Sequence, residues 1–182
     1  GTHVLQGKKA LQFLRTRHGV GDGSDLARIS NQQVFLTSLI RKVKSQGVLT
    51  NPVYLYSLAN AAARNMKLSE SMTDINVMVS LASALQDVEL DKITFLQVPA
   101  RGGLPAPYSG RVAPIYEQAN VLFSKIANDE PLVLAKANTG AGAIVKDDPS
   151  ASPSPSPSGS PDKDTLPDWA RGTNAATTTC SS

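Results

Sequence analysis

The chain has 182 residues, which is enough for one domain with a hydrophobic core. Lysine and arginine total 18, and aspartate and glutamate total 15. The net charge of +3 is too small to indicate a nucleic-acid-binding protein by itself. The one cysteine, Cys180, cannot form an internal disulfide, and no spacing of cysteine and histidine is typical of a zinc site. Cys180 is interpreted as a free thiol, or as one that pairs with another chain or with a part of the protein outside these residues.

The first part of the chain predicts two helices separated by a loop. Residues 7–14 have an apolar side and predict a short helix. Three glycines within residues 19–23 are incompatible with a regular helix and predict a loop. Apolar residues at helical spacing predict the longest helix at residues 25–45, with Ser24 or Asp25 as its N-cap.

Further elements follow in the second part. A proline in the first turn favours a third helix at residues 52–64. Thr73 is expected to cap a fourth helix that ends near residue 87. Residues 93–98 predict a strand, and residues 115–127 predict a last helix.

The composition changes after residue 147. Residues 149–161 are nearly all serine and proline, which predicts an extended, disordered linker. We therefore expect one domain at residues 1–147, followed by a disordered linker and short tail at residues 148–182. Trp169 in this tail is expected to be exposed unless it docks on another surface.

No apolar run reaches the ~18 residues that a membrane-spanning helix requires. The chain begins at Gly1 and turns directly into helix-like sequence, so we interpret it as a fragment of a longer protein. The absence of a signal peptide or anchor in these residues then says little about localisation.

The long helix carries polar residues on the side that becomes apolar further along. At about 100° per residue, Asp25, Arg28 and Gln32 fall within roughly 60° of one another. This side, which we expect to face the core, continues with Leu36, Leu39, Ile40 and Val43. The opposite side, which we expect to face solvent, holds Ser30, Asn31, Ser38, Arg41, Lys42 and Lys44.

An arginine that faces inward must be paired or must line a polar cavity. One interpretation of Arg28 is a simple pair with Asp25, three residues earlier. However, Arg15 and Arg17 precede the glycine loop that leads to the same helix start, where free N–H groups also attract anions. Because guanidinium groups match phosphate oxygens, the combination predicts a phosphate site. On their own, Arg15 and Arg17 would be a solvated loop edge, and His18 in that loop is not favoured as a base.

Two segments then carry a combination of motifs. Residues 5–18 follow the pattern Leu-x-Gly-x-x-Ala-Leu-x-aromatic-x-Arg-x-Arg, and residues 25–33 follow Asp-apolar-x-Arg-x-x-x-Gln-Gln. This combination resembles the LytR-CpsA-Psr family, and later motifs fall in the family's order, so the resemblance covers about residues 3–100. The serine- and proline-rich linker is similar to that of actinobacterial members. Asn31 stands where the family often has arginine, and its outward position on the wheel predicts little loss.

The resemblance implies an α/β fold in which this chain is the helix-rich C-terminal half of an α/β/α sandwich, followed by a disordered tail. It implies an enzyme of the cell envelope that moves a glycopolymer from a polyprenyl pyrophosphate carrier onto peptidoglycan. Arg15, Arg17, Arg28 and Gln32 would bind the pyrophosphate. Asp25 would act with Arg28 in catalysis, by orienting an arginine or by assisting deprotonation of the acceptor hydroxyl.

The same resemblance implies parts that these residues lack. The Mg²⁺ ligands and an extracytoplasmic membrane anchor are expected in a preceding N-terminal part, and the fragment alone is expected to be inactive and poorly soluble. Two alternatives remain at this stage. One is a non-catalytic module that binds anions or nucleic acid, although aromatic residues for base stacking make up only 5% of the chain. The other is a structural wall-associated domain.

Overall fold

The computed structural model describes residues 3–45, 47–67, 69–72, 74–146 and 164–182. Its helices are α1 (Lys8–Arg15), α2 (Asp25–Ser45), α3 (Pro52–Asn65), α4 (Ile75–Ala84) and α5 (Tyr116–Ala127). Three short 3-10 turns are η1 (Glu70–Met72), η2 (Leu90–Lys92) and η3 (Gly140–Gly142). All five predicted helices are therefore confirmed. None of the helices in the described ranges is long and apolar enough to cross a membrane.

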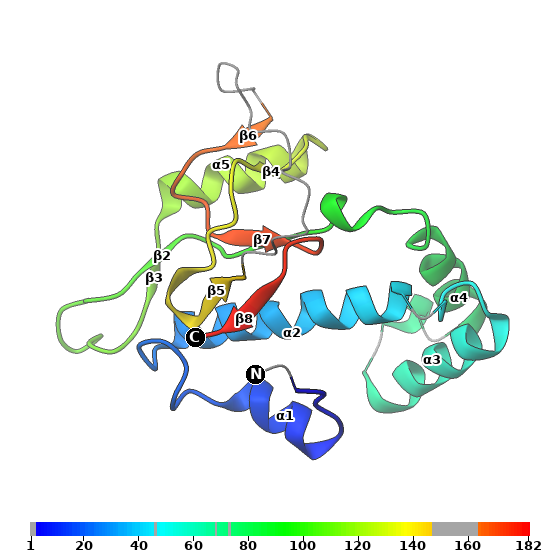
Figure 1. Ribbon diagram of the computed structural model, residues 1–182. Coiled ribbons are helices and arrows are strands. Elements are labelled where there is room, and N and C mark those ends of the chain that lie inside the picture. Colours follow the sequence, from blue (N-terminus) through cyan, green and yellow to red (C-terminus); the bar gives the residue numbers. More distant parts are fainter. Residues whose placement is uncertain (1–2, 46, 68, 73, 147–163) are drawn as a thin grey trace.

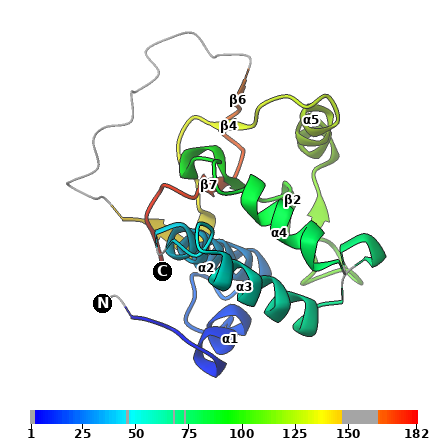
Figure 2. The same cartoon turned by 90° about the vertical axis from the view of Figure 1, so that its right-hand side faces the viewer.

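Helix α2 runs through the middle of the molecule (Figure 1). It begins after Ser24, whose hydroxyl oxygen accepts a hydrogen bond of 3.1 Å from the N–H of Ala27, so Ser24 is the cap. Helix α1 lies on one side of α2, and α5 lies toward the opposite side of the molecule (Figure 2). Helices α3 and α4 pack against each other near the end of α2.

The caps of α3 and α4 follow from single side chains. The Asn51 side chain accepts hydrogen bonds from the N–H groups of Val53 and Tyr54 at the start of α3. Asp74 accepts a bond of 2.8 Å from the N–H of Asn76 and caps α4. The expectation of a helix running to residue 87 is wrong, because α4 ends at Ala84. The predicted cap Thr73 lies outside the described residues.

The strands form short two-stranded ladders. The pairs in the described residues are β1 (Thr94–Leu96) with β7 (Gly172–Asn174), β2 (Ala100–Arg101) with β3 (Ala113–Pro114), β4 (Val133–Leu134) with β6 (Thr165–Leu166), and β5 (Ala143–Val145) with β8 (Thr179–Ser181). The β4–β6 pair is parallel, and the other three are antiparallel. The helix-rich α/β composition is confirmed, and the strand predicted at residues 93–98 is present as the shorter β1.

The expectation that the tail after residue 148 stays outside the core is wrong for residues 164–182. Strands β6, β7 and β8 each pair with a strand from the earlier part of the chain. Leu166 and Ala170 are buried in a cluster with Leu122, and Trp169 packs against this cluster. The pairing was invisible in the composition, because these short strands gain their hydrogen bonds from partners more than 30 residues away along the chain. The linker predicted at residues 149–161 lies outside the described residues.

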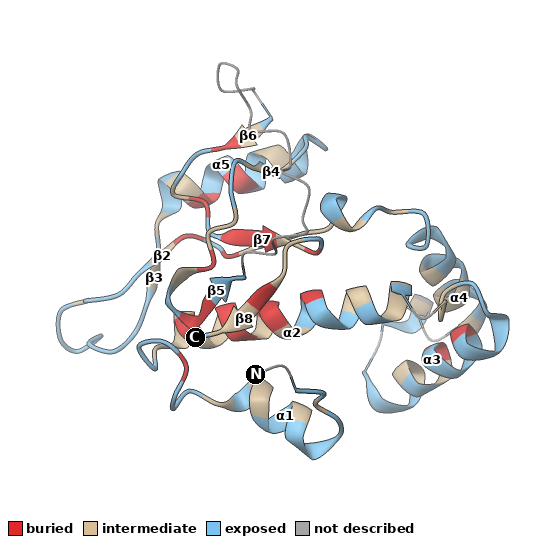
Figure 3. Ribbon diagram, viewed as in Figure 1, coloured by how far each residue is buried: buried red, intermediate tan, exposed pale blue. Residues whose placement is uncertain are grey.

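The buried side of α2 differs from the expected one. Ser30, Asn31 and Thr37 are at most 2% exposed, whereas Leu36 is 40% and Leu39 is 43% exposed. The buried positions face β5 and β8 (Figure 3). The helix-wheel expectation is therefore wrong, because the contacts that cover α2 come from η3, β5 and β8 and select its small residues.

Close backbone approach explains this choice of small residues. A Cβ on Gly142 of η3 would lie only 1.9 Å from the carbonyl oxygen of Ala27 in α2. Ala27 is itself 1% exposed, so no larger side chain fits on either backbone. A leucine-lined side of α2 would hold η3 further away.

Asn31 ties α1 to α2 from the buried side. Its Nδ2 donates a hydrogen bond of 3.0 Å to the carbonyl oxygen of Phe13, and its Oδ1 is buried without a hydrogen bond in the described part of the chain. The expectation that Asn31 faces outward and matters little is therefore wrong. A buried polar side chain at this contact is costly to remove.

We predict that Leu166→Ala destabilises the full-length protein by about 2–5 kcal/mol, the range for a buried leucine truncated to alanine. The control is Leu81→Ala on α4, because Leu81 is 49% exposed. Chemical denaturation measures both changes. Equal, near-zero losses would show that the tail does not pack on the core.

We also predict that Asn31→Ala lowers the free energy of unfolding by about 1–3 kcal/mol, because it leaves the carbonyl of Phe13 without its buried donor. Asn120→Ala on the exposed side of α5 is the matched control and should change stability by less than about 0.5 kcal/mol. A loss at Asn31 no larger than at Asn120 would contradict the buried contact.

Candidate functional site

The Asp25 carboxylate joins two arginines at the start of α2. Its Oδ1 lies 2.8 Å from Arg17 Nη2 and 2.6 Å from Arg28 Nη2. The three side chains are half-exposed, so the pairing is open to solvent and to a ligand. Two guanidinium groups around one carboxylate leave one net positive charge beside the positive end of a helix. The predicted pair of Asp25 and Arg28 is present, and Arg17 joins it.

The loop that carries Arg17 is held by the end of the chain. The N–H of Gly21 donates a hydrogen bond of 3.3 Å to the carbonyl oxygen of Ser182. The Ser182 hydroxyl donates a bond of 2.7 Å to the carbonyl oxygen of Ala141. Gly21 has a φ of +49°, and a Cβ there would lie 2.1 Å from the same Ala141 oxygen. Only glycine fits at this point of the loop.

The amide of Gln32 has a structural contact. Its Nε2 donates a hydrogen bond of 3.2 Å to the carbonyl oxygen of Leu14, in the last turn of α1. An amide nitrogen carries two hydrogens, so one N–H group is left for a ligand. Arg15 is exposed at the end of α1, and within the described residues its side chain has no ion pair. The structure therefore joins Arg17, Asp25 and Arg28. Arg15, at the end of α1, and Gln32, one turn beyond Arg28 in α2, are not part of this ion-pair cluster.

Basic residues further along α2 are engaged within the chain. Arg41 Nη1 donates a hydrogen bond of 2.9 Å to the Thr178 hydroxyl, and Lys44 Nζ donates to the carbonyl oxygens of Gln86 and Val88. The expectation that Arg41 and Lys44 lie on a solvated face is wrong, because the tail and the segment after α4 cover them. Lys42 is exposed, as expected.

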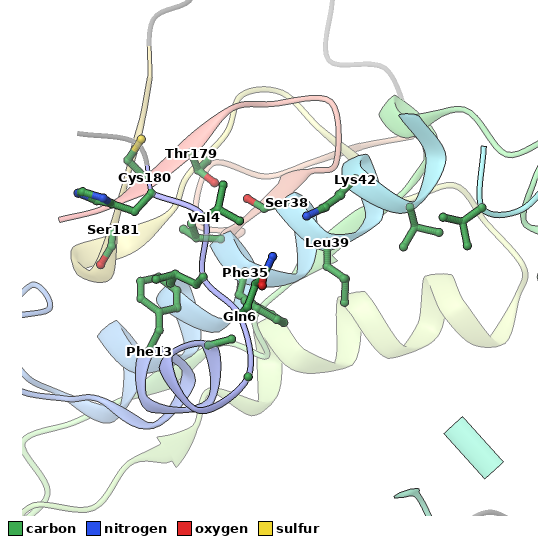
Figure 4. Close-up of a pocket in the computed structure, with 17 residues that line it drawn as sticks. Val4, Gln6, Phe13, Phe35, Ser38, Leu39, Lys42, Thr179, Cys180 and Ser181 are labelled. Atoms are coloured by element: carbon green, nitrogen blue, oxygen red, sulfur yellow. The ribbon is translucent and has the colours of Figure 1, made fainter. Parts of the chain in front are cut away.

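An apolar pocket of about 800 Å³ lies beside the cluster. It is bounded by residues 3–7, by α1, by the second half of α2 and by β8. Figure 4 shows Phe13, Phe35 and Leu39 around this space, with Thr179 and Cys180 at its edge. Sequence reasoning missed the pocket, because it placed the leucines of α2 in the core and left the tail unfolded.

The pocket and Arg28 both lie along α2. Val34 is the first α2 residue in the pocket lining, six positions after Arg28. At about 1.5 Å per residue, this separation is roughly 9 Å along the helix axis. The apolar pocket therefore begins less than two helical turns beyond Arg28 along α2.

The described residues do not form a metal site. No group of three or more histidine, cysteine, aspartate or glutamate side chains within them could hold a metal ion. Asp25 Oδ1 is already taken by two guanidinium groups, which disfavour a cation at the same oxygen. The Mg²⁺ site stays a prediction about residues outside this chain.

In the loop before α2, hydrogen bonds from the side chain and backbone of Ser24 hold the pKa of Asp22 below its usual value.

Comparisons with known proteins agree with these motifs. The chain is 37% identical over 99 residues to the cell wall biosynthesis protein LcpA of Corynebacterium glutamicum, which covers 54% of this chain and 18% of that relative. It is 32% identical over 94 residues to the polyisoprenyl-teichoic acid–peptidoglycan teichoic acid transferase TagT of Bacillus subtilis, which covers 52% of this chain and 27% of that relative. The chain thus spans less than a third of either protein. No solved structure matches it significantly.

The matched region contains the whole arginine cluster. The model of the LytR_cpsA_psr family matches residues 1–121, from before α1 to the middle of α5. This range includes Arg17, Asp25 and Arg28. Because the match covers 121 of the 182 residues, the chain belongs to the LytR_cpsA_psr family.

Proposed function

We propose that the protein transfers a glycopolymer from a polyprenyl pyrophosphate carrier to peptidoglycan, and that this chain supplies the anion-binding part of the donor site. The observation that carries the proposal is the pair of guanidinium groups that Asp25 holds at the start of α2. The relative TagT is named as a polyisoprenyl-teichoic acid–peptidoglycan teichoic acid transferase, which supports a polyprenyl-linked donor and a peptidoglycan acceptor. The proposed site of action is the outer face of the membrane, with an anchor outside these residues.

Arg17 and Arg28 bind the pyrophosphate in this proposal. Each guanidinium keeps N–H groups that Asp25 does not occupy, and planar forks suit phosphate oxygens. Arg15, two residues before Arg17, adds a third positive charge from the end of α1. Gln32 contributes its remaining N–H group and fixes the turn that carries Arg15 through its bond to Leu14.

The apolar pocket accepts part of the polyprenyl chain. Its volume of about 800 Å³ lies within the range of sites that enclose sizeable ligands. Burial of hydrocarbon there contributes binding free energy in proportion to the area removed from water. A headgroup on charged residues and a tail on apolar residues match the two parts of the proposed donor.

The transfer exchanges a phosphoanhydride bond of the pyrophosphate for a phosphate ester bond to the acceptor. The acceptor hydroxyl oxygen forms a bond to the phosphorus next to the sugar, and the bond from that phosphorus to the bridging oxygen breaks. Polyprenyl phosphate leaves, and the arginines stabilise its developing negative charge. Asp25 orients both guanidinium groups through Oδ1, and its Oδ2, which carries no hydrogen bond in the described residues, can receive the hydroxyl proton.

A nucleic-acid-binding module is the second candidate, and the structure gives it less support. Such a module needs a continuous basic surface. Arg41 and Lys44 are instead bonded to Thr178 and to backbone carbonyl groups. The arginine cluster near Asp25 is therefore a local site rather than one end of a basic stripe.

We predict that Arg28→Ala in the full-length protein weakens binding of a short-chain polyprenyl pyrophosphate about ten- to a hundredfold and lowers transfer to a similar degree. This is the loss expected for a charge-assisted hydrogen bond. Arg64→Ala, which removes an exposed arginine from the last turn of α3, is the matched control and should change little. Titrations at two salt concentrations measure the binding.

The transferase and the nucleic-acid-binding module predict different relative losses of binding for Arg28→Ala and Arg64→Ala. A nucleic-acid module predicts similar losses for Arg28→Ala and Arg64→Ala in nucleic-acid binding, with steep weakening by salt. A folded Arg28→Ala protein with normal lipid binding and normal transfer would rule out the assignment of Arg28.

A further inference from the structure

A second, polar pocket of about 360 Å³ lies on the other side of the α2 start. It is enclosed by the β1–β2 connection, by the first turns of α5 and by the segment between β6 and β7. These segments gather above the first turn of α2 on the left of Figure 1. Its polar lining residues, with one tryptophan, are Gln97, Gln118, Asn138, Asp168, Trp169 and Arg171.

The pocket walls are fixed by hydrogen bonds within the chain. The buried Gln97 donates from Nε2 to the Ser30 hydroxyl at 2.8 Å, and its backbone N–H donates to the carbonyl oxygen of Arg171 at 2.8 Å. Asn138 Nδ2 donates to the carbonyl oxygen of Asp168 at 3.4 Å. The pocket is therefore built by the tail and is held in place before any ligand binds.

The lining matches a neutral molecule with many hydroxyl groups. Amide side chains both donate and accept hydrogen bonds, as a sugar hydroxyl does. Asp168 and Arg171 have opposite charges that balance, so the pocket does not favour a phosphate. Trp169 packs against the Leu122 cluster and also lines the pocket, so it offers a rigid apolar surface beside the polar groups.

The pocket and the arginine cluster lie on different sides of the first turn of α2. Leu26 lines the pocket, and it follows Asp25 directly in the first turn of α2. Successive residues of a helix point about 100° apart, so Leu26 points to roughly the opposite side of α2 from Arg28. A ligand in the pocket is therefore separated from the guanidinium groups by the first turn of the helix, and fits a saccharide unit beyond the one that carries the transferred phosphate.

We propose that the polar pocket binds one saccharide unit of a glycan taking part in the transfer. The inference rests on the proposed function, because that function supplies glycans on both sides of the reaction. The sugar comes either from the acceptor peptidoglycan or from the donor glycopolymer. Both sources present the same hydroxyl-rich chemistry, and they are separated by the probes of the test.

The test is a ligand-observed NMR titration of the full-length protein. One probe is a soluble N-acetylglucosamine–N-acetylmuramic acid tetrasaccharide. The other is the wall glycopolymer of the source organism, released as a phosphate-free oligosaccharide. We expect at least one to bind, and the probe that binds identifies the source.

Pocket variants should weaken that binding about three- to tenfold each, the factor expected for one lost hydrogen bond. The variants are Gln118→Ala on α5 and Asp168→Ala in the tail, both away from the buried cluster. Asn120→Ala on α5 and Asp164→Ala in the tail remove the same groups from exposed positions and should leave binding unchanged.

Three outcomes would overturn the pocket assignment: neither probe binds the wild-type protein, the pocket variants bind as well as the wild type, or the controls weaken binding equally. Arg28→Ala separates this result from the proposed function. If it loses lipid binding but no probe binds the wild type, the function stands and the saccharide pocket is rejected. If a probe binds through Gln118 and Asp168 but Arg28→Ala keeps normal lipid binding, the pocket stands and the donor site is rejected.

Discussion

The packing of α2 through its small side is the constraint on which the rest of the structure depends. Gly142 approaches the backbone of Ala27 so closely that neither residue can be larger. This contact brings η3, β5 and β8 onto α2, and the end of the chain then holds the glycine loop through Gly21. Because Arg17 lies just before that loop, the same contact sets where Arg17 meets Asp25. Larger apolar residues of α2, such as Phe35 and Leu39, are left to line the apolar pocket.

Local features of the chain could be predicted from sequence alone. Capping residues and helical spacing located α2 between Asp25 and Ser45, and the three-residue separation of Asp25 and Arg28 on one helix made their pair predictable. These features depend on interactions within about one or two helical turns. The family resemblance rested on the same residues and is confirmed.

Features that depend on distant segments could not be predicted. Contacts from η3 and the tail determine which side of α2 is buried. A helix wheel cannot predict this, because it only compares the hydrophobicity of the sides of one helix. Strands of two or three residues, such as β7 with its Gly-Thr-Asn sequence, carry little signal until their partners are known. The polar pocket is lined by residues of α2, α5 and the tail, so no single segment of the sequence predicts it.

The central claim is that Arg17 and Arg28, held on one Asp25 oxygen, act together on one pyrophosphate. A double-mutant cycle measures this directly, with polyprenyl pyrophosphate affinity determined for the wild-type full-length protein, Arg17→Ala, Arg28→Ala and the double variant. Residues in one network predict a coupling free energy of about 0.5–3 kcal/mol. Losses that add within about 0.5 kcal/mol would show that the two arginines act independently and would contradict the claim.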